Sequence, residues 1–400
     1  RRSSDLVGAH TEEVSFSKQL KIFSDETHYF IYDEYWPYVK RIDKNLWVNE
    51  NFSLENVSLF VKAFIPANLN IENMDISNEM RYPEDILFWQ YPCRTEGDAA
   101  NNHLSLMSGV IGRVVHSYLP MPWATFIDKK KFPIAYMGFL ARRIAAAKEY
   151  LNKFQFELRV HTVCQHIHFL RDLPTYINEL GVTDLWVSHK TVNLGHLDKV
   201  RLHAWPLYAV NCRQVERSKG LSYLSIEQKK IFASFIGAYM PHYMSDIRLK
   251  LNAFKLIPDF VIEINDEWHF NTVVYDYQVA GKTKINPKHR YDEIVRYNEV
   301  LSNSIFSLCP SGAGPNSLRL WESMAVGSIP VILSDQYELP LLDSIPGMNQ
   351  AMWNDAVIIY PENNIQALEQ SLRAIPMSRL AEMQSNCLNI YRAIEGITCF

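Results

Sequence analysis

Residues 297–341 decide the fold and read YNEVLSNSIFSLCPSGAGPNSLRLWESMAVGSIPVILSDQYELPL. The apolar residues before Pro310 predict a buried strand, and the small residues at 311–315 predict a turn. A helix is expected to begin at 316–317, where the residue types suit a cap. The apolar run Ile329–Leu333 predicts a second strand. Strand, helix and strand in this order predict a right-handed parallel βαβ unit.

The predicted turn has the composition of an anion site. Ser311 and Gly312 allow close backbone approach, and the first amides of a helix that begins at Ser317 would point into the crevice at the carboxyl ends of the strands. Arg319, in the first helical turn, can add a bidentate contact to a phosphate. Glu322 lies three residues later on the same face, where a carboxylate can accept hydrogen bonds from the two vicinal hydroxyls of a ribose.

Two other interpretations of this stretch remain open. Glycine-rich turns between a strand and a helix are common in α/β folds, and Arg319 and Glu322 could form a solvated i,i+3 ion pair. The sequence contains neither GxxxxGK nor GxGxxG, which disfavours a P-loop nucleotidase and a Rossmann dinucleotide enzyme.

The alternation of strands and helices predicts two α/β domains, 1–215 and 216–400, joined by the polar segment 212–223. The first half is expected to hold strands at 21–33, 57–65, 85–90, 156–164, 183–188 and 200–211 and helices at 138–154 and 170–180. The second half is expected to hold strands at 231–236, 305–308 and 329–333 and helices from 245 and at 317–326, 365–375 and 380–394. The last helix could pack back on the first domain.

Composition excludes several classes of protein. With 48% apolar and 21% charged residues the chain is globular, not disordered. Forty basic residues against 44 acidic ones leave a net charge of −4, so no general basic surplus exists to bind nucleic acid. Six cysteines form no CxxC pair, which argues against a zinc ribbon and for reduced thiols in a cytosol-like compartment.

The stretch resembles the donor domain of the exostosin family of glycosyltransferases, densely over about 45 residues. The resemblance is carried by Ser304–Pro310, Gly312, Ser317, Arg319, Glu322, Ile329–Val331 and Glu338–Pro340, and more weakly by Phe235–Gly237 and Ser245–Arg248. It implies a GT-B fold, in which two Rossmann-like domains with parallel sheets face a cleft. It also implies inverting transfer from a nucleotide sugar, UDP-linked, without a cofactor or metal. The implied donor site adds Gly237, Arg248 and Glu338 to the residues above.

One feature of the sequence agrees with a metal-free mechanism. Glycosyltransferases of the other major fold hold a divalent cation through an Asp-x-Asp triplet, and no such triplet occurs in these 400 residues. A helix N-terminus and Arg319 would instead neutralise the leaving diphosphate. Arg248 or a basic loop could help to neutralise the diphosphate. The alternative for the loop is that it is only a solvated surface. This loop comprises Lys282, Lys284, Lys288, His289 and Arg290.

Inverting transfer also requires a general base on the acceptor side. Candidates are His166, His168 and Asp172, which follow one predicted strand of the first domain, and His189, which ends the next. His166 is the first choice because it comes directly after the strand. The alternative is that these histidines are satisfied partners in a polar crevice. His166 and His168 also suggest a metal site, but no third ligand occurs at zinc-like spacing.

The sequence therefore predicts a glycosyltransferase with a nucleotide sugar and a glycan or polysaccharide as substrates. The alternatives are a noncatalytic module of the same fold that binds carbohydrate or nucleotide sugar, and a GT-B-like epimerase or phosphorylase. The thiols favour a cytoplasmic protein, with peripheral contact to a membrane left open. Animal and plant members of the resembling family act in the Golgi lumen, which would apply here if an anchor preceded this sequence.

Overall fold

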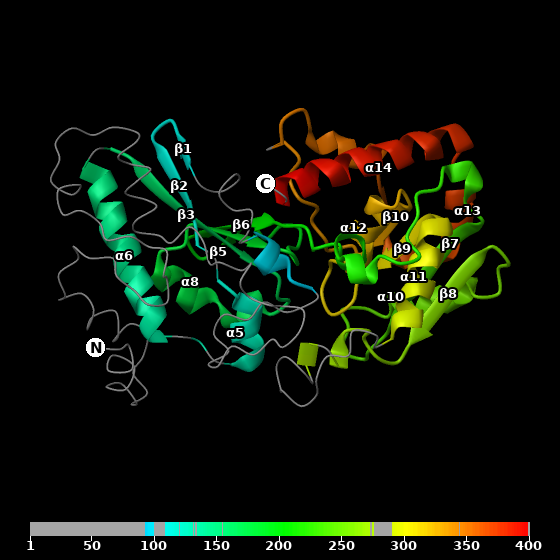
Figure 1. The fold of residues 1–400 in the computed structure, drawn as a ribbon, viewed down its shortest axis with the longest axis horizontal. Coiled ribbons are helices and arrows are strands. Elements are labelled where there is room, and N and C mark those ends of the chain that lie inside the picture. The colour runs from blue at the N-terminus through cyan, green and yellow to red at the C-terminus, as the bar shows by residue number, and fades with distance from the viewer. Residues whose placement is uncertain are drawn as a thin grey trace.

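The computed structural model describes residues 93–99, 109–119, 121–130, 132, 134–153, 155–272, 274–275, 290–343 and 345–398. They form two α/β units, which lie side by side in Figure 1. We call residues 93–204 the N-terminal unit and residues 231–398 the C-terminal unit. The strands predicted at 21–33, 57–65 and 85–90 lie outside the described residues.

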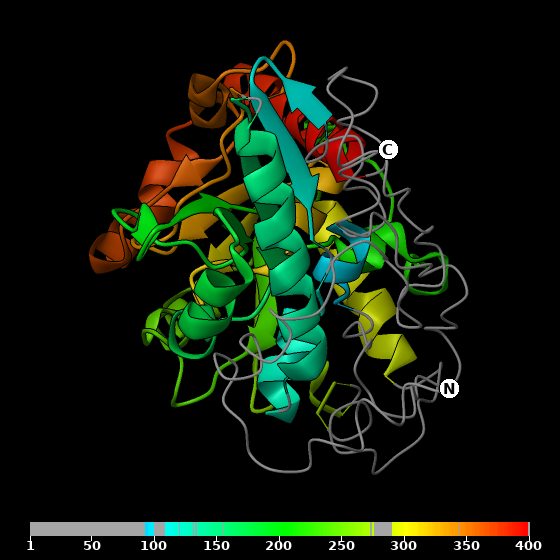
Figure 2. The same ribbon diagram turned by 90° about the vertical axis from the view of Figure 1, so that its left-hand side faces the viewer.

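The sheet of the N-terminal unit has the strand order β1-β2-β3-β4-β6-β5. β2, β3, β4 and β6 are parallel, and the edge strands β1 and β5 are antiparallel to their neighbours. The strands are β1 (Gly109–Ile111), β2 (Val114–Tyr118), β3 (Glu157–Cys164), β4 (Asp184–Val187), β5 (His196–Leu197) and β6 (Val200–Ala204). The helices are α5 (Trp123–Lys129), α6 (Ile134–Lys153), α7 (Phe169–Asp172) and α8 (Pro174–Leu180). Figure 2 shows α6 as the long helix in front of this sheet, where it packs on β3 and α8.

The sheet of the C-terminal unit has the order β11-β10-β9-β7-β8, with all neighbouring strands parallel. Its strands are β7 (Ile231–Ala238), β8 (Phe260–Asn265), β9 (Ser304–Pro310), β10 (Ile329–Leu333) and β11 (Ile358–Ile359). Successive strands are added on opposite sides of the β7–β9 pair: β8 lies beside β7 on one side, and β10 and β11 follow β9 on the other. In open parallel sheets such a switch point opens a crevice at the carboxyl ends of the two strands, where ligands bind.

Helices flank this sheet and the segment that leads to it. The α-helices are α9 (Val210–Arg213), α10 (Ile247–Lys250), α11 (Tyr291–Asn303), α12 (Leu318–Ala325), α13 (Leu368–Arg373) and α14 (Met377–Thr398). The 3₁₀ helices are η3 (Val215–Arg217), η4 (Ile226–Gln228), η5 (Leu251–Phe254), η7 (Gln350–Asp355) and η8 (Glu362–Ala367). α14 packs along α12 and β10, at the top right of Figure 1, and buries Trp321 between α12 and η7.

The predicted α/β class, two Rossmann-like units with parallel sheets, is confirmed. The predicted long helix at 138–154 is also confirmed, and begins earlier, at Ile134. The helix predicted at 170–180 is instead two helices, since Pro174 lacks an N–H and starts α8. The strand expected to stop before Gly237 continues through it to Ala238.

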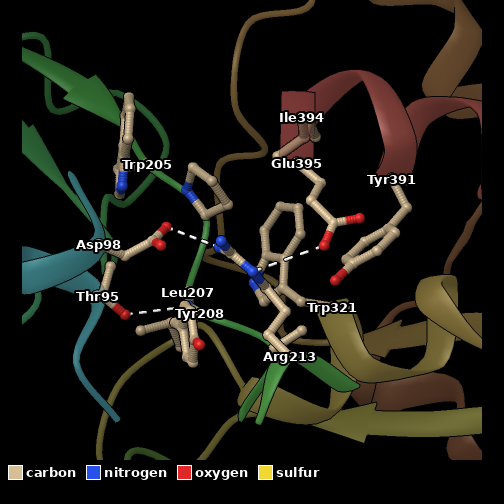
Figure 3. A pocket seen from close by; sticks show the side chains of 12 residues that line it. Thr95, Asp98, Trp205, Leu207, Tyr208, Arg213, Trp321, Tyr391, Ile394 and Glu395 are labelled. Atoms are coloured by element: carbon tan, nitrogen blue, oxygen red, sulfur yellow. Dashed lines mark hydrogen bonds and ion pairs between the residues drawn. The ribbon is translucent and has the colours of Figure 1, made fainter. Parts of the chain in front are cut away.

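A cavity of about 20 Å³ lies at the seam between the units. Arg213 crosses it, with Nη1 2.7 Å from Asp98 Oδ2 of the N-terminal unit and Nε 3.6 Å from Glu395 Oε1 of α14 (Figure 3). A space of this size holds one water molecule and no sugar. This cavity is therefore part of a structural contact between the units and not a sugar-binding site. Glu395, near the end of α14, takes part in the contact.

Two further properties bear on function. Within the described ranges, no helix combines the length and apolar character that a membrane span requires. The described cysteines, Cys93, Cys164, Cys212, Cys309 and Cys387, are free thiols.

Asn298 of α11 ties the connection between the two sheets to the C-terminal unit. Its side chain is fully buried, and its Nδ2 donates to the carbonyls of Arg217 and Lys219, at 2.8 Å each. Its Oδ1 accepts from Asn211 Nδ2 at 3.1 Å. One side chain thus satisfies three groups of the connecting segment.

We predict that Asn298→Ala lowers the free energy of unfolding by about 2–4 kcal/mol, because buried carbonyls lose their donor. Asn303→Ala is the control, since Asn303 is on the same helix and makes one exposed hydrogen bond. That change should cost less than about 1 kcal/mol. Urea unfolding of both variants measures the difference, and equal losses would contradict the bridging role of Asn298.

Candidate active site

Hydrogen bonds hold the turn after β9 at the carboxyl end of the sheet. The Ser311 amide donates to Leu333 O at 2.9 Å, and the Gly312 amide donates to Gly314 O at 2.9 Å. Ser317 is the N-cap of α12, as predicted, and the first amides of that helix have no acceptor within it. Asn316 supports the cap, because its Oδ1 accepts from Ser317 N at 2.7 Å and from Trp321 Nε1 at 3.1 Å.

Arg319 extends from the first turn of α12 to the end of β7. Its side chain is 7% exposed, and its guanidinium donates to the Ile236 carbonyl. The guanidinium carbon lies 4.7 Å from the ring centre of Phe235 and 5.0 Å from that of Tyr297. These two rings and one carbonyl fix its orientation without neutralising its charge.

Arg248 of α10 binds the same strand ends. It donates to Ala238 O at 2.6 Å, to Ser311 O at 2.8 Å and to Pro310 O at 3.4 Å. Burial lowers the pKa of Arg248 to about 10, so the side chain remains charged at neutral pH. A Cβ on Gly312 would lie 2.7 Å from the Arg248 Nη2, so glycine is required for this approach.

Within the part of the chain that the structure describes, Arg248 and Arg319 lack an ion-pair partner. Neither guanidinium forms an ion pair with any carboxylate of the described residues. Both lie at the carboxyl ends of β7 and β9, which is the switch point of the sheet. Buried charges in proteins are normally paired, so this pair of cations favours binding of an anion here. The amides at the start of α12 also favour binding of an anion at this place.

Glu322 is also buried, with 3% of its surface exposed. Its Oε1 accepts from the Asn211 amide at 3.0 Å, and its Oε2 accepts from the Tyr297 hydroxyl at 2.7 Å. Burial raises the pKa of its carboxyl group. A solvated pair with Arg319 is therefore wrong. The carboxylate oxygens that were expected to accept hydrogen bonds from ribose hydroxyls instead accept them from Asn211 and Tyr297. The second hydrogen bond fixes the Tyr297 ring that packs against the Arg319 guanidinium.

Two carboxylates near the turn have different partners. Glu362, at the start of η8, accepts from Ser245 Oγ at 2.6 Å and more distantly from Ser311 Oγ at 3.5 Å. Sequence reasoning missed Glu362, because an acidic residue at the start of a helix is common and marks no site. Glu338, expected in the donor site, forms an ion pair of 2.5 Å with Lys190 of the N-terminal unit.

Glu338 belongs to a contact that joins the two units. Thr191 and Tyr337 form an antiparallel bridge, and the Val192 amide donates to Gln336 O at 2.9 Å. These residues follow β4 in one unit and β10 in the other. The carboxyl ends of parallel strands from both sheets therefore meet.

His189 lies in this contact, directly against the turn at 311–317. Its Nδ1 accepts from the Asn316 amide at 3.4 Å, and burial lowers its pKa to about 3. A Cβ on Gly314 would lie 2.4 Å from that nitrogen and 2.8 Å from Cγ2 of Ile167. His189 is thus a neutral hydrogen-bond acceptor that holds the turn at 311–317.

His166 pairs with Asp128, a residue of α5 that sequence reasoning missed. His166 Nε2 lies 2.9 Å from Asp128 Oδ1, and His166 Nδ1 accepts from the His168 amide at 3.0 Å. Both side chains of the pair are nearly buried. The pair lies at the carboxyl end of β3, and because Ile167 touches the turn at Gly314, it lies next to the turn at 311–317.

The remaining predicted residues lie farther toward solvent. The His168 side chain is exposed, and partial desolvation lowers its pKa. Asp172 is bound by both arms of Arg171, at 2.7 and 2.8 Å, which lowers the pKa of its carboxyl group. Of the predicted basic loop only Arg290 is described, and it pairs with Glu267 at 2.6 Å.

The comparisons with known proteins cover the part of the chain that holds the arginine pair. Residues 196–375 match the family described as the Exostosin GT47 domain. An exostosin-1 homolog of Caenorhabditis elegans is 32% identical over 97 residues, which is 24% of each protein. A probable glucuronosyltransferase of Oryza sativa subsp. japonica is 38% identical over 88 residues, 22% of this chain and 20% of the relative.

A probable beta-1,4-xylosyltransferase of Arabidopsis thaliana, IRX10, is 34% identical over 93 residues, 23% of this chain and 21% of the relative. The matches thus span about a quarter or less of these curated relatives. A solved structure of the GtfA/B complex aligns with a TM-score of 0.33 at 11% identity, over 63% of this chain and 53% of that one. The predicted resemblance to the exostosin family of glycosyltransferases is confirmed over residues 196–375, which match the Exostosin GT47 domain.

Proposed function

We propose that this chain transfers a sugar from a UDP-linked donor to a glycan acceptor, with inversion and without a metal ion. The observation that carries the proposal is the pair Arg248 and Arg319, which meets no carboxylate of the described residues at the switch point of the C-terminal sheet. The names of the relatives, glucuronosyltransferase and xylosyltransferase, support the reaction class.

The diphosphate of the donor would lie between the start of α12 and the two guanidiniums. As the bond from the anomeric carbon to the diphosphate breaks, negative charge accumulates on the departing oxygen. Arg319 is already oriented by Phe235, Tyr297 and the Ile236 carbonyl, so it can stabilise this charge without rearranging. This electrostatic role replaces that of a divalent cation.

The acceptor would approach from the N-terminal unit. The ends of β3 and β4 lie against the donor-side turn through Ile167 and His189. A hydroxyl held there would attack the anomeric carbon from the face opposite the diphosphate, and this direction of attack inverts the configuration. A base at the end of β3 would take the proton of that hydroxyl.

We predict that Arg319→Ala lowers kcat about 30- to 1000-fold, because the lost contact stabilises the transition state by about 2–4 kcal/mol. Steady-state kinetics measures the effect, and circular dichroism checks the fold. Arg296→Ala is the matched control, since Arg296 is an exposed arginine that pairs with Glu263. Near-normal turnover in folded Arg319→Ala would contradict the donor-site assignment.

Glu322→Gln separates a ribose contact from a positioning role. A glutamine can accept from the Asn211 amide and donate to the Tyr297 hydroxyl. It therefore preserves the position of the Tyr297 ring against Arg319. We therefore expect kcat within about 5-fold of the original and a nearly unchanged KM for the donor. A rise in that KM of about 10-fold or more, measured by initial rates, would instead assign Glu322 to the ribose.

A further inference from the structure

A carboxylate lies close to the arginine pair without touching either guanidinium. Glu362 follows β11, and its side chain accepts from Ser245 Oγ at 2.6 Å and from Ser311 Oγ at 3.5 Å. We propose that Glu362 is a positioning residue for donor binding, because it holds the segment that carries Arg248 against the turn at 311–317. This inference rests on the proposed function, since it concerns the same diphosphate site.

Glu362 connects the carboxyl ends of four strands. Ser245 follows β7, Ser311 follows β9, Asp335 follows β10, and Glu362 itself follows β11. The Glu362 amide donates to Asp335 Oδ1 at 3.0 Å, and the Asp335 amide lies 3.4 Å from Glu362 Oε1. These bonds anchor the residue beside β10, while its carboxylate reaches the segments after β7 and β9. This is the end of a parallel sheet at which ligands bind.

The two serines bound by Glu362 are also the residues that hold Arg248. Ser245 Oγ accepts from the Ile247 amide at 3.3 Å, and Ile247 is the first residue of α10, the helix that carries Arg248. The Ser311 carbonyl accepts from Arg248 Nε at 2.8 Å. The two serine hydroxyls lie 3.3 Å apart. Loss of the carboxylate would therefore loosen the support of Arg248 on both sides.

The Met244 amide adds a backbone contact between the same two segments. It donates to Gly312 O at 2.9 Å, one residue before Ser245 and one after Ser311. The segment after β7 thus meets the turn after β9 through main chain and side chains together. Of these contacts, those made by Glu362 are the ones that a substitution can remove while the main chain stays unchanged.

Glu362 holds this arrangement without neutralising it. An ionised carboxylate only accepts hydrogen bonds, so both serine hydroxyls direct their protons toward it. Glu362 forms no ion pair with a described residue, and Arg248 donates to carbonyls alone. A direct ion pair between them would have to be broken before Arg248 could bind a diphosphate. Contact through serine hydroxyls fixes the arginine and leaves its charge available.

Positioning and electrostatics predict opposite effects when Glu362 is replaced. The negative charge of Glu362 repels a diphosphate bound nearby, so removal of that charge alone should strengthen the binding of UDP. Loss of positioning should instead weaken it, because Arg248 must then be ordered when the ligand binds. The sign of the change therefore distinguishes the two roles.

The test is a calorimetric titration of each variant with UDP and with uridine. In Glu362→Ala, the preference for UDP over uridine should fall about 5- to 20-fold, the equivalent of one or two hydrogen bonds. Glu362→Gln keeps an oxygen for Ser311 and an amide that Ser245 Oγ can accept, so its preference should stay within about threefold. Glu369→Ala is the control, since Glu369 forms a surface pair with Arg373.

Uridine is included because it lacks the diphosphate. General loosening of the C-terminal unit would weaken the binding of both ligands and leave the preference unchanged. An unchanged preference in folded Glu362→Ala would therefore overturn the proposal. A preference that rises in Glu362→Ala and Glu362→Gln alike would overturn it too, and would assign Glu362 a purely electrostatic effect. An equal fall in both variants also contradicts positioning by hydrogen bonds.

Glu362→Asp replaces the alanine variant if that one fails to fold. It keeps the charge and withdraws the carboxylate by one methylene, so the preference for UDP should again fall, and an unchanged value would overturn the proposal. If the unmodified protein binds UDP no more tightly than uridine, the proposed function fails. If it prefers UDP and Glu362→Ala keeps the full preference, only this inference fails.

Discussion

The candidate site depends on two positive charges that form no ion pair with the described residues, at the carboxyl ends of the neighbouring strands β7 and β9. Arg248 and Arg319 are held by backbone carbonyls and aromatic rings, not by carboxylates. Backbone carbonyls orient a guanidinium but carry only partial charge, so the electrostatic demand for an anion persists. Gly312 follows from this arrangement, because a side chain there would displace Arg248.

A second constraint joins the two units at that point. The turn at 311–317 contacts both sheets: Ser311 binds the end of β10, whereas Asn316 binds Ser188 and His189 after β4. The turn at 311–317 and the ends of β3 and β4 are therefore fixed relative to each other by the same residues. A structural change in one unit should therefore affect the position of the other unit.

The sequence predicted the parts of this site that are local. Residues 297–341 carry the strand, the turn, the cap at Ser317 and Arg319 within one βαβ unit, and both strands are almost entirely buried. The roles of Glu322 and His166 depend on partners that lie far along the chain. Asn211 is 111 residues from Glu322, and Asp128 is 38 residues from His166. No pattern in one sequence links such residues, so their hydrogen bonds could only come from the fold.

The differences between the predicted and observed elements have two causes. Pro174 divides a helix whose apolar spacing is continuous, and Gly237 remains inside β7 because a glycine in a strand allows close packing, here with Phe235 and Arg319. The local chemistry of proline thus decides the break at Pro174, whereas tertiary contacts accompany the continuation of β7 through Gly237. The alternation of strands and helices was sufficient to predict two parallel sheets.

The most direct test is a calorimetric titration of the protein with UDP and, separately, with uridine, both in excess chelator. If the arginine pair binds the diphosphate without a metal, UDP should bind at least about 100-fold more tightly than uridine, a difference of about 2.7 kcal/mol. Equal affinities, or UDP binding that appears only after manganese or magnesium is added, would contradict the account.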